Sequence, residues 1–186
     1  MPGLGGEVLG RLGATPVNLP GGEVFTALQT GAIAASDWVS PYNDLAFGLH
    51  KAARYYYYPG WQEPQATIEL LVNEQALAGL PEDLRAIVEE AAAAANQHMQ
   101  SDYVYNNARA LGELQAAGVQ LRRFPDEVLV ALREQSMALL GELAGQDELH
   151  GRIWQSMQDF QRQAAAMHAL SEQQLYNWRE APAVNR

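Results

Sequence analysis

The feature that most constrains this chain is the stretch from Leu80 to Gly118, LPEDLRAIVEEAAAAANQHMQSDYVYNNARALGELQAAG, which predicts one long helix. Pro81 suits the first turn of that helix, and Glu82 and Asp83 lie at its positive end. Gly118 is placed to end it. An apolar stripe on one face is expected from Leu84, Ile87, Val88 and Ala91.

Further helices are expected on both sides of this segment, at 7–12, 21–30, 41–54, 126–143 and 147–179. Gly31 lies where a C-terminal glycine belongs. Asp126 is expected to cap its helix. The inward face of that helix is expected to carry Leu129, Leu132, Ser136, Leu139 and Leu143.

The last helix carries apolar residues at nearly heptad spacing, which we call the seam: Leu149, Ile153, Met157, Phe160, Ala164 and Met167. The expected role of the seam is to pack against its own domain. Pairing with a second copy of the chain is the alternative.

Four short segments read as strands. The segment 32–39 is apolar and then polar, which predicts a buried strand that runs into a loop. The tyrosine run at 55–58 is a strand by aromatic propensity, stopped by Pro59. The segment 66–73 predicts a strand with a buried face, and 119–125 predicts another. The chain is therefore expected to mix α and β structure, without a repeated βαβ pattern.

The composition fits a globular chain and excludes some partners. Apolar residues make up 48% and charged residues 18%, so 186 residues can form a real core in one domain or one and a half. The net charge of −10 argues against a nucleic-acid partner and against a polybasic membrane contact. There is no cysteine, which excludes disulfides and thiolate chemistry.

The usual catalytic motifs are missing from the sequence. Gly3, Gly5 and Gly6 lack the spacing of a dinucleotide fingerprint and predict a tight turn before a helix. The four histidines form no HExxH pair, and no GxSxG anchors a nucleophile. An enzyme is therefore not expected.

Two segments concentrate polar and aromatic residues, AASDWVSPYNDLAFG from Ala34 and YYYYPGWQEP from Tyr55. Hard cations prefer carboxylate, amide and carbonyl oxygens. Such oxygens are offered by Asp37, Asn43, Asp44, Gln62 and Glu63. Aromatic side chains that could wall off a small anion are offered by Trp38, Tyr42 and Trp61. The alternative is that Asp44 caps the next helix and the aromatic rings fill core.

The stretch GATPVNLPGGEVFTALQTGAIAASDWVSPYNDLAFGLHKAARYYYYPGW resembles the solute-binding, DctP-type subunit of tripartite ATP-independent periplasmic (TRAP) transporters. The recurring signature is Gly-Ala-x-Pro followed by Glu-Val-[Phe/Tyr]-x-Ala-Leu-Gln-x-Gly. The version SDWVSPYNDLAFGL…YYYYPGW resembles the branch that binds 2-oxo acids and related monocarboxylates. The resemblance covers about residues 2–178.

The resemblance implies an α/β fold of the two-lobed, type II periplasmic-binding-protein kind, of which this chain would be the C-terminal portion with long helices. Residues 1–63 would form part of the second lobe with the ligand loop. Residues 64–104 would cross to the first lobe and begin the spanning helix. Residues 105–186 would return to the second lobe. The first lobe and the signal peptide are expected to lie outside this chain.

The resemblance also implies a site in which a carboxylate binds together with a cation, sodium or calcium. The expected cation ligands are Asp37, the Trp38 carbonyl and Glu63. The expected ligand contacts are Trp38, Tyr42, Asn43, Trp61 and Glu63. The family's carboxylate-binding arginine normally lies two residues before the proline of PGLGG, and is thus expected outside this chain.

An anion bound with a cation makes physical sense. A small 2-oxo acid has few apolar atoms, so burial of apolar area contributes little to its affinity. Chelation of a cation by its carboxylate and keto oxygens supplies orientation and charge balance. The cation also neutralises Asp37, which would otherwise repel the anion.

The expected function is that of a periplasmic binding protein without enzymatic activity, which delivers a small 2-oxo or 2-hydroxy acid to the membrane subunits of a TRAP transporter. The alternative is a non-binding helical association module that forms a homodimer through its C-terminal helix.

Overall fold

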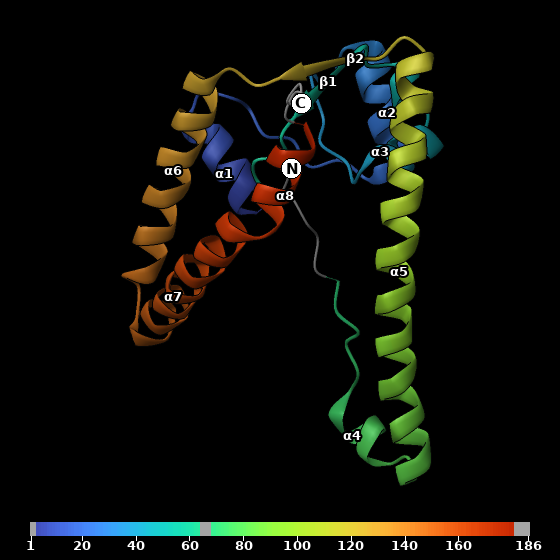
Figure 1. Cartoon of the computed structure of the whole chain (residues 1–186), viewed down its shortest axis with the longest axis vertical. Helices are drawn as coiled ribbons and strands as arrows, with labels where there is room; N and C mark the ends of the chain where they lie inside the picture. The colour runs from blue at the N-terminus through green and yellow to red at the C-terminus, as the bar shows by residue number, and fades with distance from the viewer. Residues whose placement is uncertain (1–2, 64–67, 181–186) are drawn as a thin grey trace, which may run out of the picture. The chain divides into compact units, whose positions relative to one another are not determined.

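The computed structural model describes residues 3–63 and 68–180. The chain divides into two compact units, one up to Leu132 and one from Arg133. Figure 1 shows the helices and strands coloured along the chain. None of the helices in the described part is both long and apolar enough to cross a membrane. The first unit contains the elements that position the polar and aromatic segments of the sequence.

The long helix predicted from the sequence is confirmed as α5, Glu82–Ala116, with Pro81 just before it and Gly118 at φ 94° just after it. It follows the short helix α4, Glu74–Ala78, which is capped by the side chain of Asn73. The expected apolar stripe at its start is not buried, because Leu84 is 43% and Ile87 60% exposed. Burial begins near the other end of α5, at Ala110 and Leu114.

Two strands form a parallel pair, β1 Tyr55–Tyr58 and β2 Gln120–Arg123, in the register Tyr55 to Gln120. Both were predicted. Because the chain passes through α4 and α5 between them, the two strands are joined by a long helical crossover. Tyr57 stacks on Phe124, with ring centroids 5.1 Å apart. The Arg122 guanidinium lies 5.5 Å from the Tyr55 ring centroid, as a cation–π contact.

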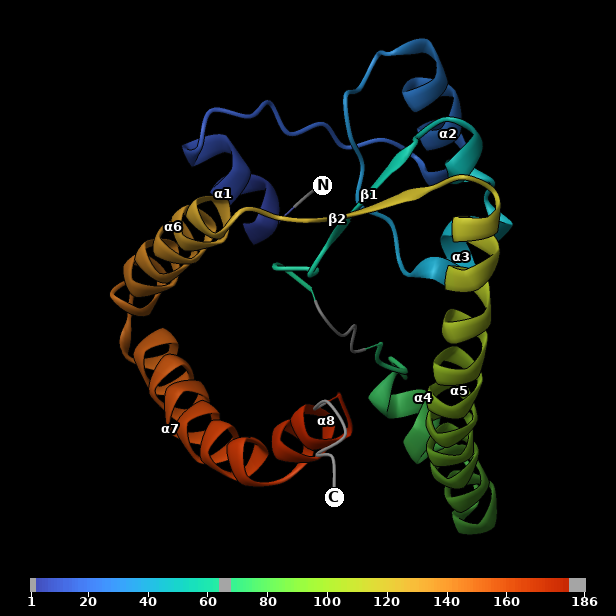
Figure 2. The same cartoon turned by 45° about the horizontal axis from the view of Figure 1, so that its top comes forward.

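The N-terminal helices match the sequence in part, because the predicted helix 7–12 begins earlier and the predicted helix 41–54 is interrupted at Gly48, φ 71°. They are α1 Leu4–Arg11, α2 Gly21–Thr30, α3 Pro41–Ala46 and the 3₁₀ turn η1 Leu49–Lys51. Gly31 ends α2 in the left-handed conformation, as the sequence predicted. Helix α3 packs against α5, which Figure 2 shows as the two lying side by side.

Two predicted strands are wrong. Residues 32–39 form bends and extended chain without a ladder partner. In the described part of the second segment, 68–73 is not a strand, and Ile68 is 74% and Leu71 91% exposed. Residues 66 and 67 lie outside the described residues. A strand exists only where a neighbouring strand completes its hydrogen bonds, and the described residues supply a single pair, β1 with β2.

The second unit is helical and is entered through α6, Asp126–Ala144, which spans the division between the units. Asp126 is the first helical residue and forms an ion pair of 2.7 Å with Arg123. The predicted inward face of α6 is confirmed, with Leu132 and Leu139 each 3% exposed.

Two helices follow, α7 Glu148–Leu170, capped by Asp147, and α8 Glu172–Glu180. The expectation that the seam packs on its own domain is wrong, because Phe160 is 71% exposed and Met167 64%. The other large seam residues are also exposed, from Leu149 at 59% to Ile153 at 51%. Other positions of α7, among them Gly151, Trp154 and Gln158, are partly buried instead.

The difference in burial along α5 predicts which of its side chains contribute to the core of the first unit, and substitutions can test this. Leu114 is 1% exposed, so Leu114→Ala removes buried methyl groups and leaves a cavity. We expect the free energy of unfolding in urea to fall by about 3 kcal/mol. Val104→Ala, on the same helix at a side chain that is 75% exposed, is the control and should change it by less than about 0.5 kcal/mol. Equal effects of the two substitutions would contradict this core.

Candidate functional site

The two polar and aromatic segments meet at Asp37. This residue lies in the loop between α2 and α3, with its side chain exposed. The Gln62 amide, from the segment after β1, donates a hydrogen bond of 3.3 Å to Asp37 Oδ2. The Ser36 hydroxyl donates to the Asp37 carbonyl at 2.9 Å. Residues 25 positions apart in the chain are thereby brought into one place.

Trp38 is held by close packing on two sides. Its ring lies against Phe47, with centroids 4.9 Å apart and planes tilted by 52°. It also lies directly over Gly21 at the start of α2, where a Cβ would come within 2.6 Å of Trp38 Cη2. Its Nε1 is buried and, in the described structure, has no hydrogen-bond partner. The approach to Gly21 was not foreseen from the sequence, which carries no signal for it beyond the glycine itself.

Asp44 is the one buried charged side chain among the described residues, at 6% exposure. Its Oδ2 accepts a hydrogen bond of 2.5 Å from the Tyr56 hydroxyl, and its Oδ1 accepts one of 3.4 Å from the Val39 N–H. Burial raises the pKa of Asp44, while the hydrogen bonds from Tyr56 and Val39 oppose that rise. Burial also raises the pKa of Tyr56, so its hydroxyl keeps the proton that it donates.

The alternative in which Asp44 caps the next helix is wrong in its position. The N-cap residue is Ser40, and Asp44 lies inside α3. Its carboxylate nevertheless accepts a hydrogen bond from the Val39 N–H, which precedes the helix. Asp44 therefore stabilises the loop before α3 and does not cap the helix. The role of Tyr56 was missed in the sequence, where it is one of four consecutive tyrosines, and strand alternation alone does not say which of them meets an acid.

Tyr42 and Asn43 are engaged in placing α3. The Tyr42 N–H donates to Asn107 Oδ1 of α5 at 3.0 Å, and its ring meets Tyr103 edge to face at 5.9 Å. Asn43 Oδ1 accepts from the Ser40 hydroxyl at 3.1 Å, within the first turn of α3. These contacts fix the helix that carries Asp44, while both side chains keep oxygen atoms with remaining acceptor capacity.

Trp61 is half-buried and Glu63 is exposed, on either side of Gln62. Within residues 3–63 and 68–180, no group of three His, Asp or Glu side chains is placed to hold a metal ion. A cation at Asp37 would therefore take further oxygen atoms from main-chain carbonyls and from its ligand. In one respect these residues fit a hard cation. The described contacts of Asp37 include the neutral Gln62 amide and no basic residue, so the negative charge of its carboxylate is available to a cation.

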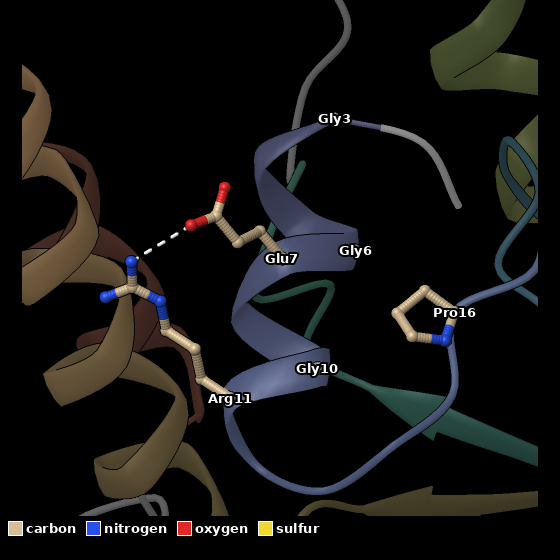
Figure 3. Close-up of a pocket in the computed structure, with 6 residues that line it drawn as sticks. All are labelled: Gly3, Gly6, Glu7, Gly10, Arg11 and Pro16. Carbon is tan, nitrogen blue, oxygen red and sulfur yellow. Dashed lines mark hydrogen bonds and ion pairs between the residues drawn. The ribbon is translucent and has the colours of Figure 1, made fainter.

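A separate hollow lies beside α1 and shares no residue with the Asp37 loop. It is lined by Gly3, Gly6, Glu7, Gly10, Arg11 and Pro16. Figure 3 shows the Glu7–Arg11 ion pair, 2.9 Å long, on the side of α1 away from Pro16. The predicted turn before the helix is confirmed at Gly3, with φ 76°, whereas Gly5 and Gly6 were expected in that turn and lie inside α1. The glycines offer only main-chain groups, and the Arg11 guanidinium that also lines the hollow is paired with Glu7.

The packing of Trp38 on Gly21 can be tested with a neighbouring glycine as control. Gly21→Ala forces the indole away and should lower the free energy of unfolding by about 1–3 kcal/mol. Gly22→Ala meets nothing within 4 Å and, in a helix, should be neutral or stabilising by up to about 1 kcal/mol. Urea unfolding of the three proteins measures both effects. Similar stability changes in the two variants would show that the indole does not depend on residue 21.

The family model "Bacterial extracellular solute-binding protein, family 7" (DctP) matches residues 2–147. A monocarboxylate 2-oxoacid-binding periplasmic protein of Nostoc is 40% identical over 172 residues, which are 92% of this chain and 47% of that protein. The chain thus spans about half the length of this relative.

Two solved structures are also similar. A TRAP transporter solute-binding protein from Bordetella bronchiseptica, a dimer with calcium and picolinate in one active site, has a TM-score of 0.90 and 35% identity, covering 96% of this chain and 53% of that one. A TRAP periplasmic solute-binding protein from Pseudoalteromonas atlantica, with sodium and pyruvate, has a TM-score of 0.88 and 38% identity, covering 95% and 54%. The expected binding-protein fold is therefore confirmed, and the chain belongs to the DctP family of bacterial extracellular solute-binding proteins.

Proposed function

We propose that this chain is the C-terminal part of a periplasmic receptor that captures a small 2-oxo monocarboxylate together with calcium or sodium, and delivers it to the membrane subunits of a TRAP transporter. The observation that carries the proposal is the Asp37 carboxylate, held by Gln62 beside the main chain of Trp38. Relatives that share this fold bind pyruvate or picolinate with those cations. Binding and release need no chemical step, so we assign no catalytic residue.

In this proposal Asp37 and the Trp38 carbonyl bind the cation, with Glu63 as a further oxygen donor. Trp38, Tyr42, Asn43 and Trp61 are proposed to border the ligand. A cation held on these oxygens attracts the carboxylate of the ligand, which Asp37 alone would repel. The ligand's own oxygens complete the coordination, which suits a donor set with few protein carboxylates.

Because the chain spans half the length of its relatives, the binding test uses a fusion protein. In it, the N-terminal half of the Nostoc relative precedes this chain. Titration calorimetry should show pyruvate binding that depends on added calcium. Asp37→Ala should weaken that binding by at least about tenfold, since it removes a ligand of the cation.

The control is Asp83→Ala, which removes the same charge from an exposed position at the first turn of α5. It should leave the affinity unchanged. The proposal fails if the folded fusion protein gives no heat with pyruvate and calcium, or if Asp83→Ala weakens binding as much as Asp37→Ala.

A second candidate function is supported by the seam on α7. Its apolar side chains are exposed at heptad spacing, and the Bordetella neighbour is a dimer. We propose that two copies of this chain pair through the seam, which would bury these side chains as in a coiled coil.

Light scattering across a range of concentrations tests the pairing. The mass of the wild-type chain should rise toward twice that of the monomer. Met157→Glu combined with Phe160→Glu places charges in the seam and should keep the chain monomeric at every concentration. Ala166→Glu adds a charge at an exposed position of α7 outside the seam and should still dimerise. A monomeric wild-type chain throughout would overturn the pairing.

A further inference from the structure

The peptide between Trp38 and Val39 has its two polar ends in different environments. Its N–H belongs to Val39 and donates to Asp44 Oδ1 at 3.4 Å. Its carbonyl belongs to Trp38 and is the main-chain oxygen proposed above as a cation ligand. In the described structure Tyr58–Pro59 is the sole cis peptide, so the Trp38–Val39 peptide is trans. In a trans peptide the N–H and C=O point in opposite directions within one plane.

A group that fixes the N–H therefore also fixes the direction of the carbonyl. Asp44 is suited to this because it is itself immobilised. It is 6% exposed and lies in α3, which packs on α5. Its second carboxylate oxygen accepts the 2.5 Å hydrogen bond from Tyr56 of β1. The loop peptide is thereby tied through one carboxylate to a helix and to a strand.

We propose that Asp44 is a positioning residue, which orients the Trp38–Val39 peptide so that the Trp38 carbonyl is presented to the cation. The inference rests on the proposed function for the identity of the cation site, but the orientation of the peptide is a property of this chain without any ligand. Asp44 does not contact the cation in this scheme. It acts through the peptide, as a residue behind a metal ligand sets that ligand's direction and charge.

The hydrogen bond has an electrostatic effect in the same direction. A carboxylate that accepts from a peptide N–H polarises the peptide and increases the negative charge on its carbonyl oxygen. The effect is stronger away from water, and Asp44 is buried. The hydrogen bond thus both orients the Trp38 carbonyl and increases the negative charge on its oxygen. Trp38 supports the same geometry through its ring, which Gly21 and Phe47 confine.

The sequence offers a probe of this single peptide. Trp is followed by Val once in the chain, at Trp38–Val39, because Trp61, Trp154 and Trp178 precede Gln or Arg. Labelling with ¹³C-carbonyl Trp and ¹⁵N Val therefore gives one cross-peak in an HNCO spectrum. Its proton and nitrogen shifts report on the Val39 N–H, which donates to Asp44. Its carbon shift reports on the Trp38 carbonyl.

The first part of the experiment uses this chain without ligand. Asp44→Ala should shift the cross-peak and speed the exchange of the Val39 amide proton with solvent. Asp44→Asn keeps an acceptor oxygen and should return the peak toward its wild-type position. The control Asp102→Ala removes an acid of α5 that accepts from Asn106 at 2.8 Å, and should leave the peak in place. An unmoved peak in folded Asp44→Ala overturns the proposal.

Should Asp44→Ala fail to fold, Tyr56→Phe takes its place. It keeps the carboxylate but removes the hydroxyl that holds it, so the same cross-peak should shift by a smaller amount. A cross-peak that stays in place in folded Tyr56→Phe would overturn the proposal, because the hydroxyl that immobilises Asp44 would then not matter to the peptide.

The second part uses the fusion protein with calcium and pyruvate. The wild-type carbonyl shift should move on binding. Asp44→Ala should weaken calcium-dependent binding by about 10- to 100-fold, and Asp44→Asn should restore part of the loss. If the wild-type protein binds and Asp44→Ala binds equally well, the positioning role is wrong and the proposed function stands. If the wild-type protein binds nothing, the proposed function fails, and with it the ligand role of the Trp38 carbonyl, whatever the first part shows.

Discussion

The hydrogen bonds of Asp44 are the interaction on which the first unit's site depends. A carboxylate loses hydration when it is buried, and the loss is tolerated only when hydrogen bonds replace the lost water. Tyr56 and Val39 supply them. This requirement joins three pieces that are separate in the sequence, namely a loop, helix α3 and strand β1. The position of Asp37, next to that loop peptide, follows from the same constraint.

The long helix α5 was predictable from the sequence and two of the strands were not, for one physical reason. A helix completes its hydrogen bonds within its own segment, so Pro81, the acids after it and Gly118 suffice to mark α5. A strand depends on a neighbour that may lie anywhere in the chain. The tyrosines of β1 pair with β2, whereas residues 32–39 and 68–73 have no strand beside them in the described structure. Apolar pattern alone does not distinguish these cases.

The candidate site shows the same division between local and distant information. The loop sequence is enough to predict that Asp37 offers an oxygen ligand. It does not predict the hydrogen bond from Gln62, because that contact depends on the path of the chain after β1. The sequence offered Asp44 as an oxygen donor for a cation or, alternatively, as a helix cap, because an acid near a helix start is often a cap. Burial against Tyr56 gives it another partner. Tyr42 could equally face a ligand or a helix by its type, and its contacts with Tyr103 and Asn107 of α5 come from tertiary packing.

The exposed apolar surface of the first unit fits a chain that spans half the length of its relatives. The side chains of Ile68, Leu70 and Leu71 and those at the start of α5 face solvent here. Apolar area of this kind contributes about 25 cal/mol per Å² when a partner surface covers it. The elements around Asp37 differ, since Val24, Asp44 and Leu49 are buried within this chain. The loop that carries Asp37 is thus anchored by buried residues of this chain, although Val39 at 54% and Phe47 at 48% beside it are exposed as well.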